Sequence, residues 1–198
     1  MTLPNQLTIL RIILSPVFLF FFLADAIWMK QISIVIYIIA ALSDWYDGWL
    51  ARKFNYITSW GKFWDPLADK ILTSFAFIGF AIVDLIPWWM VIIIVGRDVL
   101  ITLLRVFADM KNYVFTTSYY AKWKTMLQMF FLYYLLILYV AQHSPEINEI
   151  YNNLISTLLN PQLIYFAALL ITLITLHSGI LYIKRNWNII IRLFKIED

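Results

Sequence analysis

Residues 44–70 read D-W-Y-D-G-W-L-A-R-K-F-N-Y-I-T-S-W-G-K-F-W-D-P-L-A-D-K, with long apolar runs on both sides. The segment contains four aspartates, two glycines and an arginine. An Asp near the centre of a bilayer costs about 2.5–3.5 kcal/mol on insertion scales, so membrane segments rarely carry one without a functional reason. These carboxylates therefore indicate a site.

The composition around this segment is that of an integral membrane protein. The chain has 198 residues, of which 63% are hydrophobic and 14% charged, whereas soluble domains are about 45–50% apolar and about 25% charged. No cysteine is present, which excludes disulfides, Cys-ligated zinc and a thiol nucleophile. Only two histidines, His143 and His177, are present, which argues against His-based catalysis.

The apolar runs predict an all-α polytopic membrane protein that forms one domain over residues 1–198. Each run is close to the roughly 20 residues that cross the hydrocarbon core. Six transmembrane helices are expected, at 8–25, 31–52, 65–84, 87–108, 118–141 and 162–184. The Asp65–Pro66 pair suits a helix start with Pro66 in the first turn, and Pro87 suits another.

Short interfacial helices are expected at both termini, one before the first span and one in the tail from residue 184 to 198. The tail alternates basic residues with Trp and Ile, which is typical of a helix that touches anionic lipid. Apolar residues at helical spacing in 143–161 predict a further amphipathic helix on the outer surface.

Charge is distributed unevenly across the predicted membrane. All but Lys30 of the 15 Lys and Arg residues fall on or near the side that holds Arg52. The positive-inside rule then places both termini and the aspartates at the cytoplasmic face of the cell membrane.

The aspartates share helix faces. At about 100° per residue, one face of the first segment carries Asp44, Asp47, Gly48, Ala51 and Arg52. Gly61, Asp65 and Asp69 likewise stack one turn apart. If the two segments form an antiparallel pair joined around residues 55–59, four carboxylates converge on one pocket.

Four converging carboxylates repel one another unless cations bind between them. Oxygen-only ligands suit Mg²⁺, Mn²⁺ or Ca²⁺, so the pattern predicts a divalent-metal site for one or two ions. Gly48 and Ala51 leave room for a substrate, and Arg52 could hold a phosphate as a planar, permanently charged fork.

A second polar group lies on the same predicted side of the membrane. Arg97, Asp98 and Arg105 occupy the fourth span, and Lys122 and Lys124 open the fifth. Arg97 is about ten residues into its span, too deep to snorkel, so it should face the interior and pair with a carboxylate or a bound phosphate. For Arg105, Lys122 and Lys124, ordinary positive-inside flanking is the alternative.

The full spacing D-x2-D-G-x2-A-R-x8-G-x3-D-x3-D resembles the signature of the CDP-alcohol phosphotransferase family. The resemblance implies that Asp44, Asp47 and Asp65 are metal ligands and that Asp69 is the general base, also near a metal. It further implies Mg²⁺ or Mn²⁺ as cofactor, a nucleotide site near Gly48, Ala51, Arg52 and Gly61, and a homodimer. Asn5 and Thr8, otherwise capping candidates of the first helix, become candidates for the nucleotide-phosphate edge.

Within that family, the basic group resembles the bacterial phosphatidylglycerophosphate synthase branch. The fifth span opens A-K-W-K-T-M-L-Q-M, with Ala121 where that branch has Gly, and Ser178–Gly179 ends the last span. The resemblance implies transfer of a phosphatidyl group from CDP-diacylglycerol to sn-glycerol 3-phosphate, giving phosphatidylglycerol phosphate and CMP. The acceptor phosphate would be bound by some of Arg97, Arg105, Lys122 and Lys124.

Two alternatives stay open. An inositol phosphate or another alcohol could accept the phosphatidyl group by the same chemistry, and a phosphorylated acceptor would explain the basic excess. Intramembrane carboxylates also mark divalent-cation or proton-coupled transporters. Nucleic acid is not an expected partner.

Overall fold

The computed structural model describes residues 3–54, 59–111, 113, 115–116 and 119–194. Within these ranges, the side chains of residues 3–4, 45, 47–52, 54, 59–60, 62 and 194 lie outside the description. The described part of the chain is helical, with no strand. Its helices are α1 (Leu3–Leu23), α2 (Ile27–Phe54), α3 (Ser59–Ile82), α4 (Trp88–Met110), α5 (Tyr119–His143), α6 (Pro145–Leu158), α7 (Pro161–Arg185) and α8 (Trp187–Phe194).

In the described part of the chain, four helices are long and apolar enough to cross a membrane: α1, α2, α5 and α7, in the windows Asn5–Leu23, Ile27–Asp44, Tyr119–His143 and Pro161–Arg185. The helices α3 and α4 have similar lengths, 24 and 23 residues. Both carry charged side chains along their length, such as Asp69 in α3 and Asp98 in α4. The predicted all-α membrane class is therefore confirmed, while the count of six spans stays a prediction.

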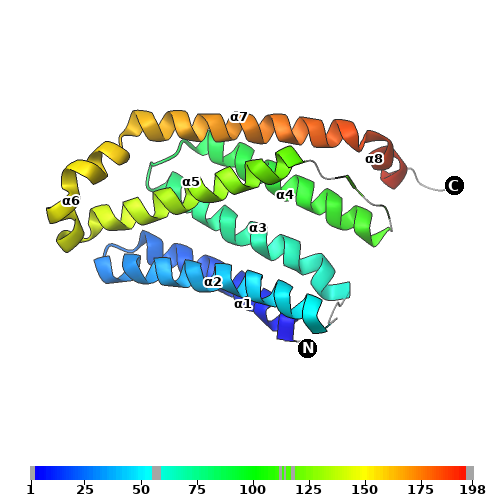
Figure 1. Cartoon of the computed structure of the whole chain (residues 1–198), viewed down its shortest axis with the longest axis horizontal. Helices are drawn as coiled ribbons and strands as arrows, with labels where there is room; N and C mark the ends of the chain where they lie inside the picture. Colours follow the sequence, from blue (N-terminus) through cyan, green and yellow to red (C-terminus); the bar gives the residue numbers. More distant parts are fainter. Residues whose placement is uncertain (1–2, 55–58, 112, 114, 117–118, 195–198) are drawn as a thin grey trace.

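The long helices run lengthwise through the molecule (Figure 1). The helices α1 and α2 lie together, α3 passes between them and α4, and α7 lies along the opposite edge (Figure 1). The helix α6 joins α5 to α7 at one end, and α8 lies at the other. The carboxyl end of α2 and the start of α3 lie at the same end as α8 (Figure 1).

An aromatic core fixes the first three helices and α5. The ring of Phe18 lies 5.1 Å from Tyr37, and the ring of Phe22 lies 5.7 Å from Phe80 and 4.9 Å from Tyr139. At Gly79 an added Cβ would lie 3.0 Å from Phe22. The missing side chain therefore allows α1 and α3 to approach closely, and this approach positions the polar ends of the same two helices.

Two expected helix starts are wrong. The helix α3 begins at Ser59 and contains Pro66, rather than beginning at the Asp65–Pro66 pair. A proline inside a helix loses one backbone hydrogen bond, and this exposed position tolerates that loss. At the N-terminus, α1 is continuous from Leu3, so no separate interfacial helix precedes it in the described residues.

The other peripheral helices are confirmed. The amphipathic segment forms α6, which buries Ile155 and exposes Ile150 and Leu154. The tail forms α8 after a break at Asn186. The buried Asn186 amide donates to the Tyr182 carbonyl, and its Oδ1 accepts from the Thr116 backbone N–H at 3.1 Å, which ties this turn to the α4–α5 connection.

Candidate functional site

One face of α1 is polar although it is buried. Asn5, Thr8 and Arg11 follow one another at intervals of three residues, so they lie along the same side of the helix. Thr8 and Arg11 have no exposed surface, and Asn5 is 8% exposed. Buried polar groups need partners, and the neighbouring helices supply them.

The α1 face contacts two of the signature aspartates. The Thr8 hydroxyl donates a hydrogen bond to Asp65 Oδ1 at 2.5 Å, and Arg11 Nη1 lies 2.7 Å from Asp44 Oδ1. Asp65 belongs to α3 and Asp44 to α2. The first helix thus connects the two helices that carry the signature, and it does so through Thr8, a predicted residue, and Arg11, which sequence reasoning did not assign.

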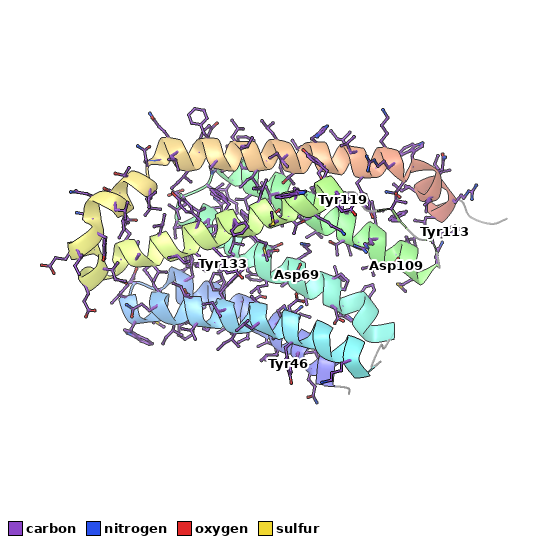
Figure 2. All side chains as sticks on the ribbon, viewed as in Figure 1. Tyr46, Asp69, Asp109, Tyr113, Tyr119 and Tyr133 are labelled. Carbon is purple, nitrogen blue, oxygen red and sulfur yellow. The ribbon has the colours of Figure 1, made fainter. Side chains whose placement is uncertain are left out.

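The described aspartates of α2 and α3 lie close enough for their charges to interact. The charges of both Asp65 and Asp69 act on Asp44. Asp69 lies in the middle of the molecule on α3, one turn beyond Asp65 (Figure 2). Gly61 is buried one turn before Asp65. The predicted stacking of Gly61, Asp65 and Asp69 on one helix is therefore confirmed.

Part of the predicted metal and nucleotide site lies outside the described side chains. Asp47, Gly48, Ala51 and Arg52 fall within α2, but only their backbone is described. Residues 55–58, where the two segments were expected to join, lie outside the described residues. Among the side chains that the structure describes, no three His, Cys, Asp or Glu residues are placed to hold one ion. The donor set itself, carboxylate oxygens without sulfur or imidazole, is the one that Mg²⁺ and Mn²⁺ prefer.

A second carboxylate is buried between α4, α5 and α7. Asp98 Oδ1 accepts from Arg97 Nη1 at 2.8 Å and from Lys124 Nζ at 2.5 Å, and Asp98 Oδ2 accepts from Gln128 Nε2 at 3.1 Å. Asp98, Lys124 and Gln128 are at most 4% exposed. We call this group of four residues the Asp98 network. The expected pairing of Arg97 with Asp98 is confirmed.

Arg97 extends the network to α7. Its Nη2 donates to Ser178 Oγ at 2.8 Å. A Cβ at Gly179 would lie 3.1 Å from Arg97 Cγ, so the glycine gives the arginine stem room to pass. The Ser178–Gly179 pair noted in the sequence thus accommodates the Arg97 side chain: Ser178 accepts its hydrogen bond, and Gly179 leaves space for its stem. Beside it, His177 Nδ1 lies 3.1 Å from the Tyr120 hydroxyl and joins α7 to the start of α5.

A cavity of about 720 Å³ opens next to the Asp98 network. Its charged lining consists of Lys70, Arg97, Asp98, Arg105 and Lys122. Four of these side chains are cations and one is a carboxylate, so the lining carries an excess of positive charge even though Arg97 pairs with Asp98. Such a lining attracts an anion, and guanidinium and ammonium groups are the usual ligands of phosphate.

The structure separates the four predicted acceptor residues into two groups. Arg97, Arg105 and Lys122 line the cavity. Lys124 is 1% exposed, does not line the cavity, and points its Nζ at Asp98. Lys124 therefore lies behind Asp98, outside the cavity lining.

Lys70 connects the two polar regions. Its Nζ lies 3.2 Å from Asp69 Oδ2, it lines the cavity, and the charges of Asp98 and Arg97 act on it. Sequence reasoning missed Lys70, Gln128 and Arg11. A signal was present for each: Lys70 directly follows Asp69, Gln128 is one helical turn after Lys124, and Arg11 continues the spacing of Asn5 and Thr8.

Comparison with known proteins finds similarity over most of the chain. Residues 1–174 match the sequence model of the CDP-alcohol phosphatidyltransferase family. A Bacillus subtilis protein named CDP-diacylglycerol--glycerol-3-phosphate 3-phosphatidyltransferase is 39% identical over 139 residues, 64% of this chain and 72% of that protein. Proteins of the same name from Rickettsia bellii and Salmonella typhimurium are 35% identical over 179 residues and 36% identical over 138. These alignments cover 89% and 67% of this chain and 92% and 75% of those proteins.

Proposed function

Because the chain belongs to the CDP-alcohol phosphatidyltransferase family, we propose that it transfers the phosphatidyl group of CDP-diacylglycerol to sn-glycerol 3-phosphate in phospholipid synthesis. The products are phosphatidylglycerol phosphate and CMP. The observation that carries the proposal is the adjacency of the aspartates to a positively charged cavity, with Lys70 between them. A donor pyrophosphate and a phosphorylated acceptor need these two environments side by side.

Asp69 is the proposed general base. Its carboxylate takes the proton of the acceptor hydroxyl, the acceptor oxygen bonds to the phosphatidyl phosphorus, and the bond from that phosphorus to the CMP oxygen breaks. Asp69 borders the cavity through Lys70, so it lies where an acceptor bound there can reach it.

Asp44, Asp47, Asp65 and Asp69 are the proposed ligands of two divalent ions, Mg²⁺ or Mn²⁺. When bound, such ions neutralise phosphate oxygens and stabilise charge on the leaving group. Thr8 and Arg11 fix the carboxylates of Asp65 and Asp44. These two contacts preorganise the ligand set from α1 and support the assignment.

The nucleotide end of the donor is assigned to Asn5, Thr8, Gly48, Ala51, Arg52 and Gly61. Support comes from Asn5 and Thr8, which share the buried α1 face that reaches Asp65, and from Gly61, which is buried one turn away. The acyl chains of a donor bound there would extend into lipid.

The acceptor phosphate is assigned to Arg97, Arg105 and Lys122 in the cavity wall, with Lys124 adding charge from below. Glycerol 3-phosphate satisfies this requirement, and inositol phosphate would satisfy it as well. Serine and choline carry no phosphate for these cations to bind.

We further propose that α3 and α4 also cross the membrane, giving six spans with both termini and the site at the cytoplasmic side of the cell membrane. Each of the two helices exceeds the roughly 20 residues that a span needs. Arg97 and Asp98 of α4 pair with each other inside the Asp98 network, which lowers the cost of inserting their charges. A homodimer remains part of this proposal.

The test follows CMP release by purified full-length protein from CDP-diacylglycerol and Mg²⁺ or Mn²⁺. Glycerol 3-phosphate, inositol phosphate, inositol and serine are supplied in parallel. We expect release with glycerol 3-phosphate alone, lost on chelation of the metal. CMP release with a different alcohol would overturn the assignment of glycerol 3-phosphate as the acceptor. Release with none of the four compounds would favour a transporter.

The acceptor assignment is tested by Arg97→Ala. Loss of a charge-assisted contact worth about 1.5–3 kcal/mol predicts a KM for glycerol 3-phosphate raised by about 10–100-fold, while the KM for the donor changes much less. Steady-state kinetics with each substrate varied in turn measures the two effects. An unchanged acceptor KM would contradict a role for Arg97 in binding the acceptor phosphate.

A further inference from the structure

A groove lies at the junction of α7 and α8. It has a volume of about 390 Å³ and is lined by Ile180, Ile183, Lys184 and Trp187. The spacing i, i+3 and i+4 places the first three on one face of α7, and Trp187 begins α8. The helix α7 lies along one edge of the molecule (Figure 1), and Ile180 and Trp187 are 63% and 54% exposed. This face of the described chain is therefore open to its surroundings.

The groove is separate from the positively charged cavity. Tyr182 lines the cavity. At about 100° per residue, Ile180 and Lys184 each lie about 200° around the helix from Tyr182. The cavity and the groove therefore lie on opposite sides of α7, and an occupant of the groove would contact this helix without entering the cavity.

The lining of the groove combines an apolar surface with two polar donors. Ile180 and Ile183 supply hydrocarbon, while the Lys184 ammonium and the Trp187 indole N–H can both donate to an anion. The groove lies where the Pro161–Arg185 window ends, and Lys and Trp at such an end are typical of the membrane–water interface. An acyl chain therefore matches the isoleucines, and a lipid phosphate at headgroup depth matches the donors.

The charge around the groove selects among lipids. Lys184, Arg185 and Arg192 are exposed, and residues 176–194 contain no Asp or Glu. Basic residues at the cytoplasmic ends of membrane helices attract anionic lipid headgroups, whereas a zwitterionic headgroup brings no net charge to balance them. Charge complementarity therefore favours an anionic phospholipid.

Contacts at the junction connect the groove to the cavity wall. The Asn186 amide donates to the Tyr182 carbonyl at 2.9 Å, and Asn186 Oδ1 accepts from the Thr116 backbone N–H at 3.1 Å. Lys111 Nζ donates to the carbonyl of Leu193 in α8 at 3.1 Å. A ligand that holds the end of α7 against α8 therefore also holds the wall residue Tyr182 and the α4–α5 connection.

We propose that the groove binds one anionic phospholipid of the surrounding membrane, with its phosphate at Lys184 and Trp187 and an acyl chain along the two isoleucines. By holding the junction, this lipid tightens the binding of a phosphorylated acceptor in the cavity. The second part rests on the proposed function, whereas the lipid site does not. The proposed product is itself an anionic phospholipid, so the site would let the enzyme respond to its own class of product.

The first test counts lipids on the purified full-length protein by native mass spectrometry. The protein is held in neutral detergent with added phosphatidylglycerol or phosphatidylcholine of the same acyl chains. We expect Lys184→Met to retain one phosphatidylglycerol fewer than the wild type, because a lost charge-assisted contact weakens the site by about 10–100-fold. Lys184→Arg, which keeps the charge, should retain the lipid. Retention of phosphatidylcholine should be the same in all three proteins.

Arg185→Met is the matched control, because Arg185 is an exposed cation next to Lys184 that does not line the groove. It removes the same charge, so any diffuse attraction to lipid falls equally in both variants. We expect Arg185→Met to retain phosphatidylglycerol as the wild type does. Equal loss in both variants would show a diffuse surface and overturn the site. Loss of a protein dimer in Lys184→Met with unchanged lipid would assign the groove to a second copy and overturn it as well.

The second test measures the Kd of glycerol 3-phosphate by calorimetry in the presence of each lipid. Coupling between two sites typically changes an affinity by about 5–150-fold, and we expect the low end, about fivefold tighter binding with phosphatidylglycerol than with phosphatidylcholine. Lys184→Met should lose this response, and Arg185→Met should keep it. The same Kd with both lipids in the wild type would overturn the coupling to the cavity.

The outcomes separate this inference from the proposed function. Neither mass spectrometry nor calorimetry needs turnover. Lipid retention that does not depend on Lys184 would overturn the inference even if the wild type transfers the phosphatidyl group. If the wild type releases no CMP with any acceptor, the proposed function fails, while lipid retention that depends on Lys184 would still support the site.

Discussion

The signature aspartates and the Asp98 network both place carboxylates inside a helical bundle, but the two regions neutralise them differently. Asp44 keeps 45% of its side chain exposed although Arg11 pairs with it, and Asp69 keeps 32%. The side chain of Asp98 alone is 5% exposed, and it accepts from three side chains on two helices. The first region therefore leaves carboxylates accessible, as the proposed metal site requires, whereas the carboxylate of the second is enclosed by its own partners.

The largest effect should come from removing a charge in the first region. Asp65→Asn keeps an oxygen that can accept from Thr8 but lowers the charge available to a metal. We expect turnover to fall at least about 10³-fold, since metal stabilisation is worth several kcal/mol, while the unfolding temperature changes little. CMP release and tryptophan-monitored thermal unfolding measure the two quantities. Asp47→Asn should behave in the same way, and near-normal turnover in both variants would contradict a metal site.

In the Asp98 network, by contrast, we expect removal of the charge to lower the stability of the fold. Asp98→Asn leaves the half-buried Arg97 and the buried Lys124 without their counter-charge, and breaking a buried ion pair costs about 3–5 kcal/mol. The free energy of unfolding, measured by denaturant titration in micelles, should fall by about 3 kcal/mol. Asp109→Asn is the control, because Asp109 is exposed near the end of the same helix (Figure 2). Equal stability of the two variants would refute a structural role for the network.

The smallest effect is expected from removing a hydroxyl that orients one of the signature aspartates. Thr8→Val removes the hydroxyl that donates to Asp65. Groups that orient metal ligands typically change affinity by about 10–100-fold, and we expect the low end, about tenfold weaker Mn²⁺ binding in the absence of substrate. Titration followed by electron paramagnetic resonance measures it. Thr8→Ser, which keeps the hydroxyl, should bind Mn²⁺ as the wild type does.

Most of the helix pattern could be predicted from the sequence because hydrophobic runs and charges determine it directly. The exceptions have local reasons. Pro66 is a strong signal for a helix start, yet Trp64, Gly61 and Ser59 already belong to α3. Pro66 lies at an exposed position, where the helix tolerates one missing hydrogen bond. The terminal helix α8 was predictable, but the side-chain contacts of Asn186 that create the break before it were not.

The candidate site was predictable only where spacing within one helix defines it. The stacking of Asp65 on Asp69 follows from helical geometry, and the pairing of Arg97 with Asp98 follows from the cost of burying a lone charge. The contacts of Arg11 with α2 and of Lys124 with α4 depend on how helices pack. Sequence spacing carries no information on that packing, so Lys124 was predicted as a candidate ligand of the acceptor phosphate, and Arg11 was given no role.

The ion pair between Arg11 and Asp44 also bears on how the chain enters the membrane. An arginine within a span costs about 2.5–3.5 kcal/mol when it is inserted alone, and the partner of Arg11 follows later in the chain, near the end of the Ile27–Asp44 window. Stable insertion of α1 is therefore expected to wait for α2, so that the two helices enter as a hairpin with the charges already paired. The residue that fixes a carboxylate in the mature site would then also set the order of assembly during biogenesis.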